Sequence, residues 1–239
     1  MNQRLLFLLF LISHPVAAKA GLIIKGHDTT IQVGGTTTVD FTIESDSVDF
    51  LQAINFSFGI TTAGPTRLEF VSPQSDLQLL DGSYVFAGDS HAADSGFPVG
   101  FVGTAATPND TYSGGDFTCS FFDVAVDGTA KLLVRLEVTT QTTLPLFNPV
   151  AGDTFTITMA EPNTDPFQPD FSDSFGIVVP VLPPSSTGPS SDFTATVTVV
   201  NAVNAVPEPA SVLVWTLIGG LGVVAGRRRT NKQAVDLID

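Results

Sequence analysis

Carboxylates are the side chains of this chain that could bind a metal ion. Between residues 21 and 206 the sequence holds 21 acidic residues, 17 of them Asp, against four basic ones, so the net charge is −17. Oxygen ligands, which calcium requires, are concentrated in two segments predicted to be loops, Asp110 to Asp116 and Asn163 to Asp173. Neither segment has the closing Glu of an EF-hand loop. We therefore expect no cofactor. Calcium is the metal ion that the composition permits. The alternative to a calcium site is that the acidic residues only keep the surface soluble.

A serine that follows a predicted strand raises the question of hydrolase chemistry. The run Gly88-Asp89-Ser90 superficially resembles the Gly-Asp-Ser block of SGNH-type hydrolases. A serine nucleophile needs a positioned base, and the late Asp-His pair of that family is missing because no histidine follows His91. His27 and His91, without a cluster of cysteines, do not predict a zinc site. We interpret Ser90 as part of a polar turn and expect no enzymatic activity.

The single cysteine and the two tyrosines limit which other reactions and ligands the sequence predicts. Cys119 has no partner for a disulfide within the chain, and it alternates with Phe117 and Phe121. This alternation predicts a buried thiol rather than a reactive or lipidated one. Tyr84 and Tyr112 are the aromatic residues expected to stay exposed, which is too few for a sugar-binding platform. The negative charge excludes nucleic acid as a partner.

The elements that must position these residues are predicted to be strands. Apolar and polar residues alternate with a period of two in five segments, in which Thr, Val and Phe dominate. These segments are 39–44, 54–60, 132–138, 155–159 and 193–199. Gly-Gly and Asp-Gly pairs between the segments indicate turns. Many short strands with one apolar face each predict an all-β fold, an antiparallel β-sandwich of the Ig-like or cohesin-like type.

Two irregularities interrupt the alternating pattern. Between Phe117 and Val126 the apolar positions shift by one residue, which predicts a β-bulge. The Pro- and Ser-rich segment from Leu182 to Asp192 is interpreted as a long loop before the last strand. One domain is therefore expected over residues 21–200, followed by a short stalk over residues 201–209.

The opening of this domain resembles a known β-sandwich family. Val33-Gly34-Gly35 precedes the strand pattern at Val39 to Ile43, and Phe56-Ser57-Phe58 follows in the next predicted strand. This order is similar to the first strands of cohesin-like β-sandwiches, in which a valine-glycine turn precedes a strand that the next strand faces. The resemblance implies a fold and a role in binding.

The N-terminus has the composition of an export signal. Arg4 supplies a positive charge, Leu5 to Ile12 forms a short apolar core, and Ala18-Lys19-Ala20 fits the small-x-small cleavage pattern. Residues 1–20 are thus predicted to be a secretory signal peptide, cleaved after Ala20. Its apolar core is too short to span a bilayer permanently.

The C-terminus predicts a membrane segment with a defined orientation. The run from Ala210 to Gly226 is 17 residues without a charge, which in a helix spans roughly 25 Å, the short end of what crosses a bilayer. Arg227, Arg228 and Arg229 follow directly. Because cationic side chains are retained on the cytoplasmic side, residues 227–239 are expected inside and the domain outside.

Together with Pro207, Glu208 and Pro209, the apolar run and the three arginines resemble the PEP-CTERM sorting signal of exported bacterial proteins. The resemblance implies transient insertion in the inner membrane and recognition by an exosortase, a membrane-embedded protease that cuts near the Pro-Glu-Pro. Such proteins occur in species that make exopolysaccharide. One difference is that ten residues follow Arg229, whereas such tails usually end soon after the basic cluster.

These observations predict an exported protein of the cell surface or extracellular matrix, with a structural or adhesive role associated with exopolysaccharide or another surface protein. The alternative is a calcium-dependent carbohydrate-binding or protein-binding module of cohesin-like fold.

Overall fold

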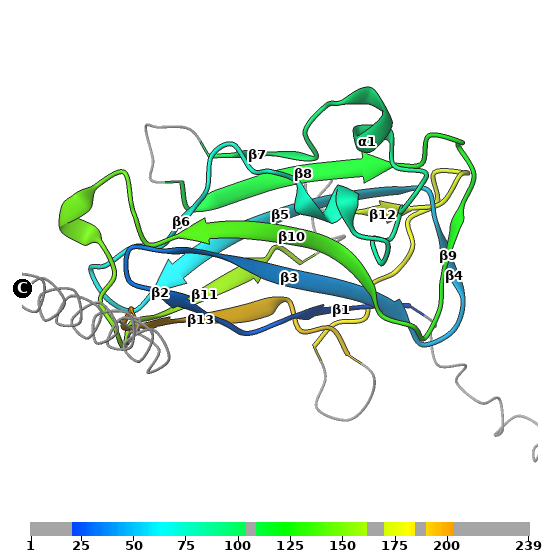
Figure 1. Ribbon diagram of the computed structural model, residues 1–239. Helices are drawn as coiled ribbons and strands as arrows, with labels where there is room; N and C mark the ends of the chain where they lie inside the picture. The colour runs from blue at the N-terminus through cyan, green and yellow to red at the C-terminus, as the bar shows by residue number, and fades with distance from the viewer. Residues whose placement is uncertain (1–20, 104–108, 162–169, 185–189, 203–239) are drawn as a thin grey trace, which may run out of the picture. The chain divides into compact units, whose positions relative to one another are not determined.

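The strands form two sheets that face each other, as Figure 1 shows for a computed structural model. The model describes residues 21–103, 109–161, 170–184 and 190–202. The smaller sheet has the order β1 (Leu22–Gly26), β3 (Thr36–Ser45), β10 (Lys131–Thr139) and β6 (Glu69–Phe70). The larger sheet has the order β2 (Thr29–Gln32), β13 (Thr194–Val200), β11 (Thr154–Met159), β5 (Ala53–Thr62), β8 (Thr111–Phe117) and β7 (Gly100–Val102), and β12 (Phe171–Ser172) also pairs with β5.

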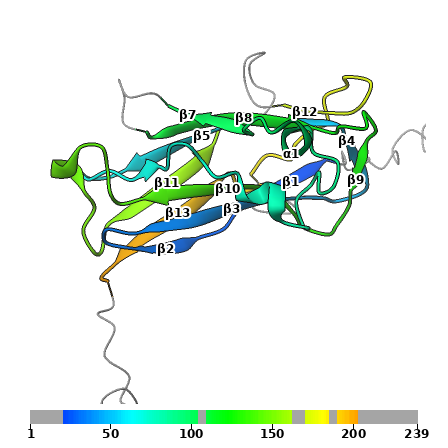
Figure 2. The ribbon, with the colours of Figure 1, turned by 45° about the horizontal axis from the view of Figure 1, so that its top comes forward.

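Shorter elements complete the domain. A two-stranded sheet of β4 (Asp49–Leu51) and β9 (Val124–Val126) lies at one end of the sandwich (Figures 1 and 2). The helical elements are α1 (His91–Ser95) and two 3₁₀ turns, η1 (Leu77–Leu80) and η2 (Pro145–Phe147). The β-sandwich predicted from the alternating pattern is therefore confirmed.

The ends of the chain lie outside the described residues. They include the predicted signal peptide with Ala18 and Ala20, and the sorting motif with Pro207, Glu208, Pro209, Arg227, Arg228 and Arg229. Within the residues that the structure describes, no helix is long and apolar enough to cross a membrane.

The core forms because one face of each long strand is apolar. In β5, Ile54, Phe56 and Phe58 are buried, whereas Asn55 on the other face is exposed. In β3, Phe41 points to the same core from the opposite sheet, and its ring centroid lies 4.7 Å from that of Phe58. The period of two in the sequence thus assigned the inward faces of these strands correctly, as it did for β11 and β13.

The β-bulge predicted between Phe117 and Val126 is wrong. The apolar positions shift after Phe117 because β8 ends there and a turn leads to β9, in which Val126 is buried. The irregularity in pairing occurs in β10, between Leu132 and Val134 opposite β3. Leu133 is the extra residue, and its side chain is fully buried although the alternation had assigned it to the outer face.

One strand pair departs from the predicted antiparallel arrangement. β2 pairs with β13 in parallel, with Thr29 opposite Val197 and Gln32 opposite Val200. The chain leaves the smaller sheet after Gly26 and continues in the larger sheet, so its second strand runs beside the last one. Gly26 permits this crossing, because a Cβ atom there would lie 2.2 Å from the carbonyl oxygen of Thr194.

Residues 71–99, the β6–β7 connection, form a long excursion that contains η1 and α1. Backbone hydrogen bonds of 2.9 Å fix it to β10: the Val85 N–H donates to the Leu132 carbonyl, and the Leu132 N–H donates to the Ser83 carbonyl. Arg135 of β10 donates two hydrogen bonds of 2.7 Å to Asp40 and one of 3.1 Å to Asp81. The Asp40 hydrogen bonds raise the pKa of the Arg135 guanidinium, so the arginine side chain stays protonated.

Candidate functional site

Asp116, proposed as a calcium ligand from the sequence, is a buried structural carboxylate. It is 5% exposed and accepts hydrogen bonds from the Ser90 hydroxyl at 2.5 Å and the Tyr84 hydroxyl at 3.0 Å. The backbone N–H groups of Ala92 and Phe117 donate to its other oxygen at 3.1 and 2.8 Å. Asp116 therefore fixes α1 and the β6–β7 connection to the end of β8.

All of the segment from Asp110 to Asp116 except Asp110 lies in strand β8, so it is not the predicted loop. At about 3.3 Å per residue, its two carboxylates are separated by roughly 20 Å. In the second candidate segment, Asp173 accepts N–H groups of Phe175 and Ile177 at 2.9 Å, which shapes a turn, and residues 162–169 lie outside the described part. No three His, Cys, Asp or Glu side chains of the described residues are grouped as a metal site would require.

Ser90 is the N-cap of α1, since its hydroxyl accepts the Ala93 N–H at 3.1 Å while it donates to Asp116. The ring of His91 stacks on Phe117 with 4.1 Å between centroids. His27 belongs to a different part of the sandwich and contacts the Thr42 hydroxyl at 2.9 Å. Ser90 therefore belongs to a polar turn, as the sequence indicated, and the two histidines are separate.

The predictions for Cys119 and the tyrosines need correction. Cys119 is only partly buried, because it lies in the turn after β8, and a hydrogen bond to the Asp94 carboxylate raises the pKa of its thiol. Tyr84 and Tyr112, expected on the surface, are buried. Among the residues that the structure describes, six phenylalanines are exposed instead: Phe50, Phe97, Phe101, Phe121, Phe122 and Phe175. Most of them lie in turns and short elements, where no second sheet covers them.

Two of the most exposed apolar side chains of the β6–β7 connection flank a pocket of about 370 Å³. Leu80, at the end of η1, is 86% exposed, and Phe97, which follows α1, is 71% exposed. We call this the Asp76 pocket. Its walls are Ser75, Asp76, Leu79, Leu80, Ala92, Ala93, Gly96, Phe97 and Pro98. It is an apolar pocket with a single ionisable side chain.

That side chain is Asp76, which has an unusual backbone conformation and environment. Its φ of 50° lies in the left-handed region, which Asp tolerates better than most residues. One carboxylate oxygen accepts the Val99 N–H at 3.1 Å, and the other is buried. The neighbouring Gln78 is buried too, and its side chain lies beside the Asp76 carboxylate.

Burial raises the pKa of the Asp76 carboxyl, although the Val99 N–H and then the Gln78 side chain partly oppose the effect. A carboxylate with a raised pKa, placed in a largely apolar pocket, is a feature of binding sites. Sequence patterns do not predict this site, because its walls come from two separate parts of a segment without periodicity.

Comparisons with known proteins give only remote similarities. No family profile and no curated protein matches the sequence. Among solved structures, the chain is similar to the sixth cohesin from scaffoldin B of Acetivibrio cellulolyticus, in complex with a Cel5 dockerin, with a TM-score of 0.46 and 11% identity over 75% of this chain and 99% of that chain. It is also similar to a non-cellulosomal cohesin from Archaeoglobus fulgidus, with a TM-score of 0.44 and 11% identity over 76% of this chain and 92% of that chain.

A third similar structure is a cohesin–dockerin complex from Clostridium thermocellum, with a TM-score of 0.44 and 12% identity over 80% of this chain and 100% of that chain. All three structures contain cohesin domains. At these TM-scores and identities, the similarity identifies neither a family nor a ligand for this chain.

Proposed function

We propose that this domain is a non-catalytic protein-binding module and that the Asp76 pocket is its recognition site. The observation that carries the proposal is the Asp76 carboxylate in the wall of a pocket whose two flanking apolar side chains, Leu80 and Phe97, remain in solvent. Exposed apolar side chains around a pocket mark interaction surfaces more often than isolated ones do.

The chemistry of the pocket selects the partner. A lysine or arginine side chain can place its aliphatic stem against Leu80 and Phe97 and its charged end near Asp76. The net charge of −17 over residues 21–206 also favours the approach of a basic surface. The partner is therefore a protein that presents a basic residue among apolar ones.

A photo-activated cross-linking amino acid at position 80 or 97 is expected to form one discrete adduct in the native cells, because both side chains flank the site. The Asp76→Asn change should weaken the adduct several-fold, since it removes the charge while Asn still tolerates the left-handed conformation. The matched control is position 146, where Leu146 is 95% exposed on η2, away from the pocket. Adducts of equal yield from position 146, or an adduct that does not respond to Asp76→Asn, would refute the proposed site.

We also propose that the protein reaches the cell surface or the extracellular matrix through its terminal signals, where it has an adhesive or structural role. The support is the sequence: a signal peptide ending at Ala20, then Pro207-Glu208-Pro209, an apolar run and three arginines. An exosortase is the protease that this resemblance implies. Exopolysaccharide or a second surface protein would then surround the mature domain.

Mass spectrometry of the protein recovered from its own culture medium should find Gly21 at the N-terminus and no peptide after Pro209, because C-terminal sorting signals are removed. Peptides covering 227–239 in the secreted protein would contradict cleavage.

Changing Arg227, Arg228 and Arg229 to Gln should leave an unprocessed precursor, since the charge that retains the tail inside is lost. Normal processing of the triple variant would contradict the role of the arginines.

A further inference from the structure

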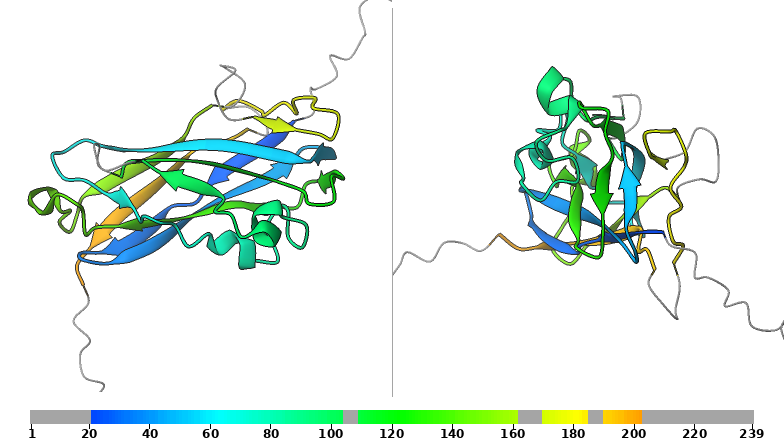
Figure 3. Two further views of the ribbon diagram at one scale, coloured as in Figure 1. Left: turned by 90° about the horizontal axis from the view of Figure 1, so that it is seen from above. Right: turned by 90° about the vertical axis from the view of Figure 1, so that its right-hand side faces the viewer.

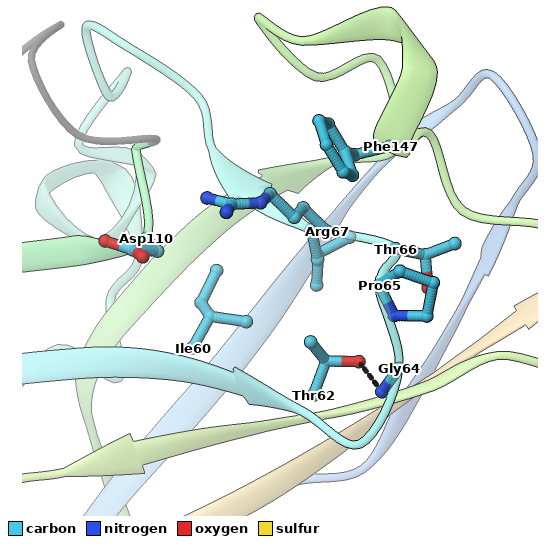
Figure 4. A pocket seen from close by; sticks show the side chains of 9 residues that line it. Ile60, Thr62, Gly64, Pro65, Thr66, Arg67, Asp110 and Phe147 are labelled. Carbon is cyan, nitrogen blue, oxygen red and sulfur yellow. Dashed lines mark hydrogen bonds between the residues drawn. The ribbon is translucent and has the colours of Figure 1, made fainter.

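A second pocket lies at the end of β5 opposite to the pairing with β12. Its volume is about 330 Å³, within the range of small-molecule sites. Figure 4 shows the side chains that line it, and we call it the Arg67 pocket. The lining residues are Ile60, Thr62, Gly64, Pro65, Thr66, Arg67, Leu68, Asp110 and Phe147.

Arg67 is fixed in this pocket by Phe147. The Arg67 N–H donates to the Phe147 carbonyl at 2.8 Å, and the guanidinium carbon lies 5.4 Å from the centroid of the Phe147 ring. This cation–π contact orients the guanidinium without occupying its hydrogen-bond donors. In Figure 4 the guanidinium extends toward the side of the pocket that carries Asp110.

The other three basic residues between residues 21 and 202 are already engaged. Lys25 pairs with Glu44, Arg135 pairs with two aspartates, and the Lys131 ammonium donates to the Ala125 carbonyl at 2.9 Å. Within the described part of the chain, the Arg67 guanidinium has neither an ion pair nor a hydrogen bond. In a domain with so many carboxylates, an arginine that stays unpaired is available to a ligand.

Asp110 supplies the opposite charge on the other wall. Its carbonyl accepts the Ile60 N–H at 2.8 Å, which fixes the residue just before β8, whereas its carboxylate has no hydrogen-bond partner among the described residues. The two side chains do not form an ion pair with each other. The Arg67 pocket therefore presents an unused cation and an unused anion, with the apolar Ile60 and Pro65 beside them.

From this arrangement we infer that the Arg67 pocket binds a small, net-neutral zwitterion, such as an α-amino acid. The ligand's carboxylate pairs with the guanidinium, whose planar donors suit a carboxylate, and its ammonium group pairs with Asp110. A simple organic anion would complement Arg67 equally well, but the net charge of −17 opposes its approach. A zwitterion has no net charge for this field to repel, and a neutral sugar leaves both charges unpaired. This site is independent of the Asp76 pocket.

Isothermal titration of the intact secreted protein with L-alanine, D-glucuronate and D-glucose tests the inference. We expect saturable binding of L-alanine, weaker binding of D-glucuronate, and none of D-glucose. Arg67→Gln and Asp110→Asn should each weaken L-alanine binding about tenfold or more, because each removes a charge-assisted contact. Arg67→Lys should lose less, since it keeps the charge but not the planar donors.

The matched control is Lys131→Gln, which removes one positive charge from the same domain outside the pocket and should leave the affinity unchanged. The wild-type titration decides the question even if a variant is unstable. Absence of saturable L-alanine binding, binding of D-glucuronate as tight as that of L-alanine, or an equal loss in Lys131→Gln would each overturn the inference.

Discussion

Phe56→Ala is expected to lower the free energy of unfolding by about 3–5 kcal/mol, because it removes a buried aromatic ring from the centre of the core. Phe56 is 1% exposed, and its ring centroid lies 5.7 Å from that of Phe58 and 6.0 Å from that of Tyr112. The loss would be a large part of the total stability of about 5–15 kcal/mol that is usual for a domain. Chemical denaturation followed by fluorescence or circular dichroism measures it.

The matched control is Asn55→Ala in the same strand, on the exposed face. It should change the free energy of unfolding by about 0.5 kcal/mol or less, as surface substitutions usually do. Equal losses for the two variants would show that β5 does not bury the face on which Phe56 lies.

Asp116→Ala is expected to be nearly as damaging, with a loss of about 3–5 kcal/mol, because it leaves several buried donors without an acceptor. The donors left without an acceptor would be the hydroxyls of Tyr84 and Ser90 and the N–H of Ala92. Hydrogen exchange should accelerate first in the β6–β7 connection, since this carboxylate holds α1 against β8. Equilibrium unfolding and exchange mass spectrometry report the two effects separately.

Asp123→Ala is the matched control for Asp116→Ala, because it removes a hydrogen-bonded carboxylate outside the buried network. Asp123 also accepts hydrogen bonds, from the N–H and hydroxyl of Ser174 at 2.7 and 2.9 Å, but it is only partly buried. Its loss should cost about 1 kcal/mol or less, because water can replace the missing acceptor. If Asp116→Ala and Asp123→Ala behaved alike, the buried network would not be what stabilises α1.

The strands could be predicted from the sequence because the alternation of apolar and polar residues is visible within each segment alone. In β5 the residues Ile54, Phe56 and Phe58 alternate with polar ones, and that pattern alone determines which face is buried. The prediction failed where the burial of a residue depends on a distant segment. Leu133 is buried because β10 bulges against β3, and Tyr112 is buried under residues from other strands.

The two candidate sites could not be found from local patterns. Arg67 and Phe147 are 80 positions apart, and only the fold brings the guanidinium over the ring. Asp116 was recognised as a possible ligand because of its oxygen atoms, but its hydrogen-bond donors Tyr84 and Ser90 precede it by 32 and 26 positions. The one usable signal for the Asp76 pocket was the presence of Leu80 and Phe97 outside any alternating segment.

The parallel pairing of β2 with β13 determines how the domain carries mechanical load. Strand β1 begins at one end of the sandwich and β13 ends at the other, as Figures 1 and 3 show. β13 is hydrogen-bonded to β2 on one side and to β11 on the other. A pull between residues 21 and 201 therefore draws β2 and β13 past each other along their length. The hydrogen bonds between β2 and β13 lie across this direction, so they are loaded in shear and must break together rather than one at a time. The domain therefore resists tension between its two ends.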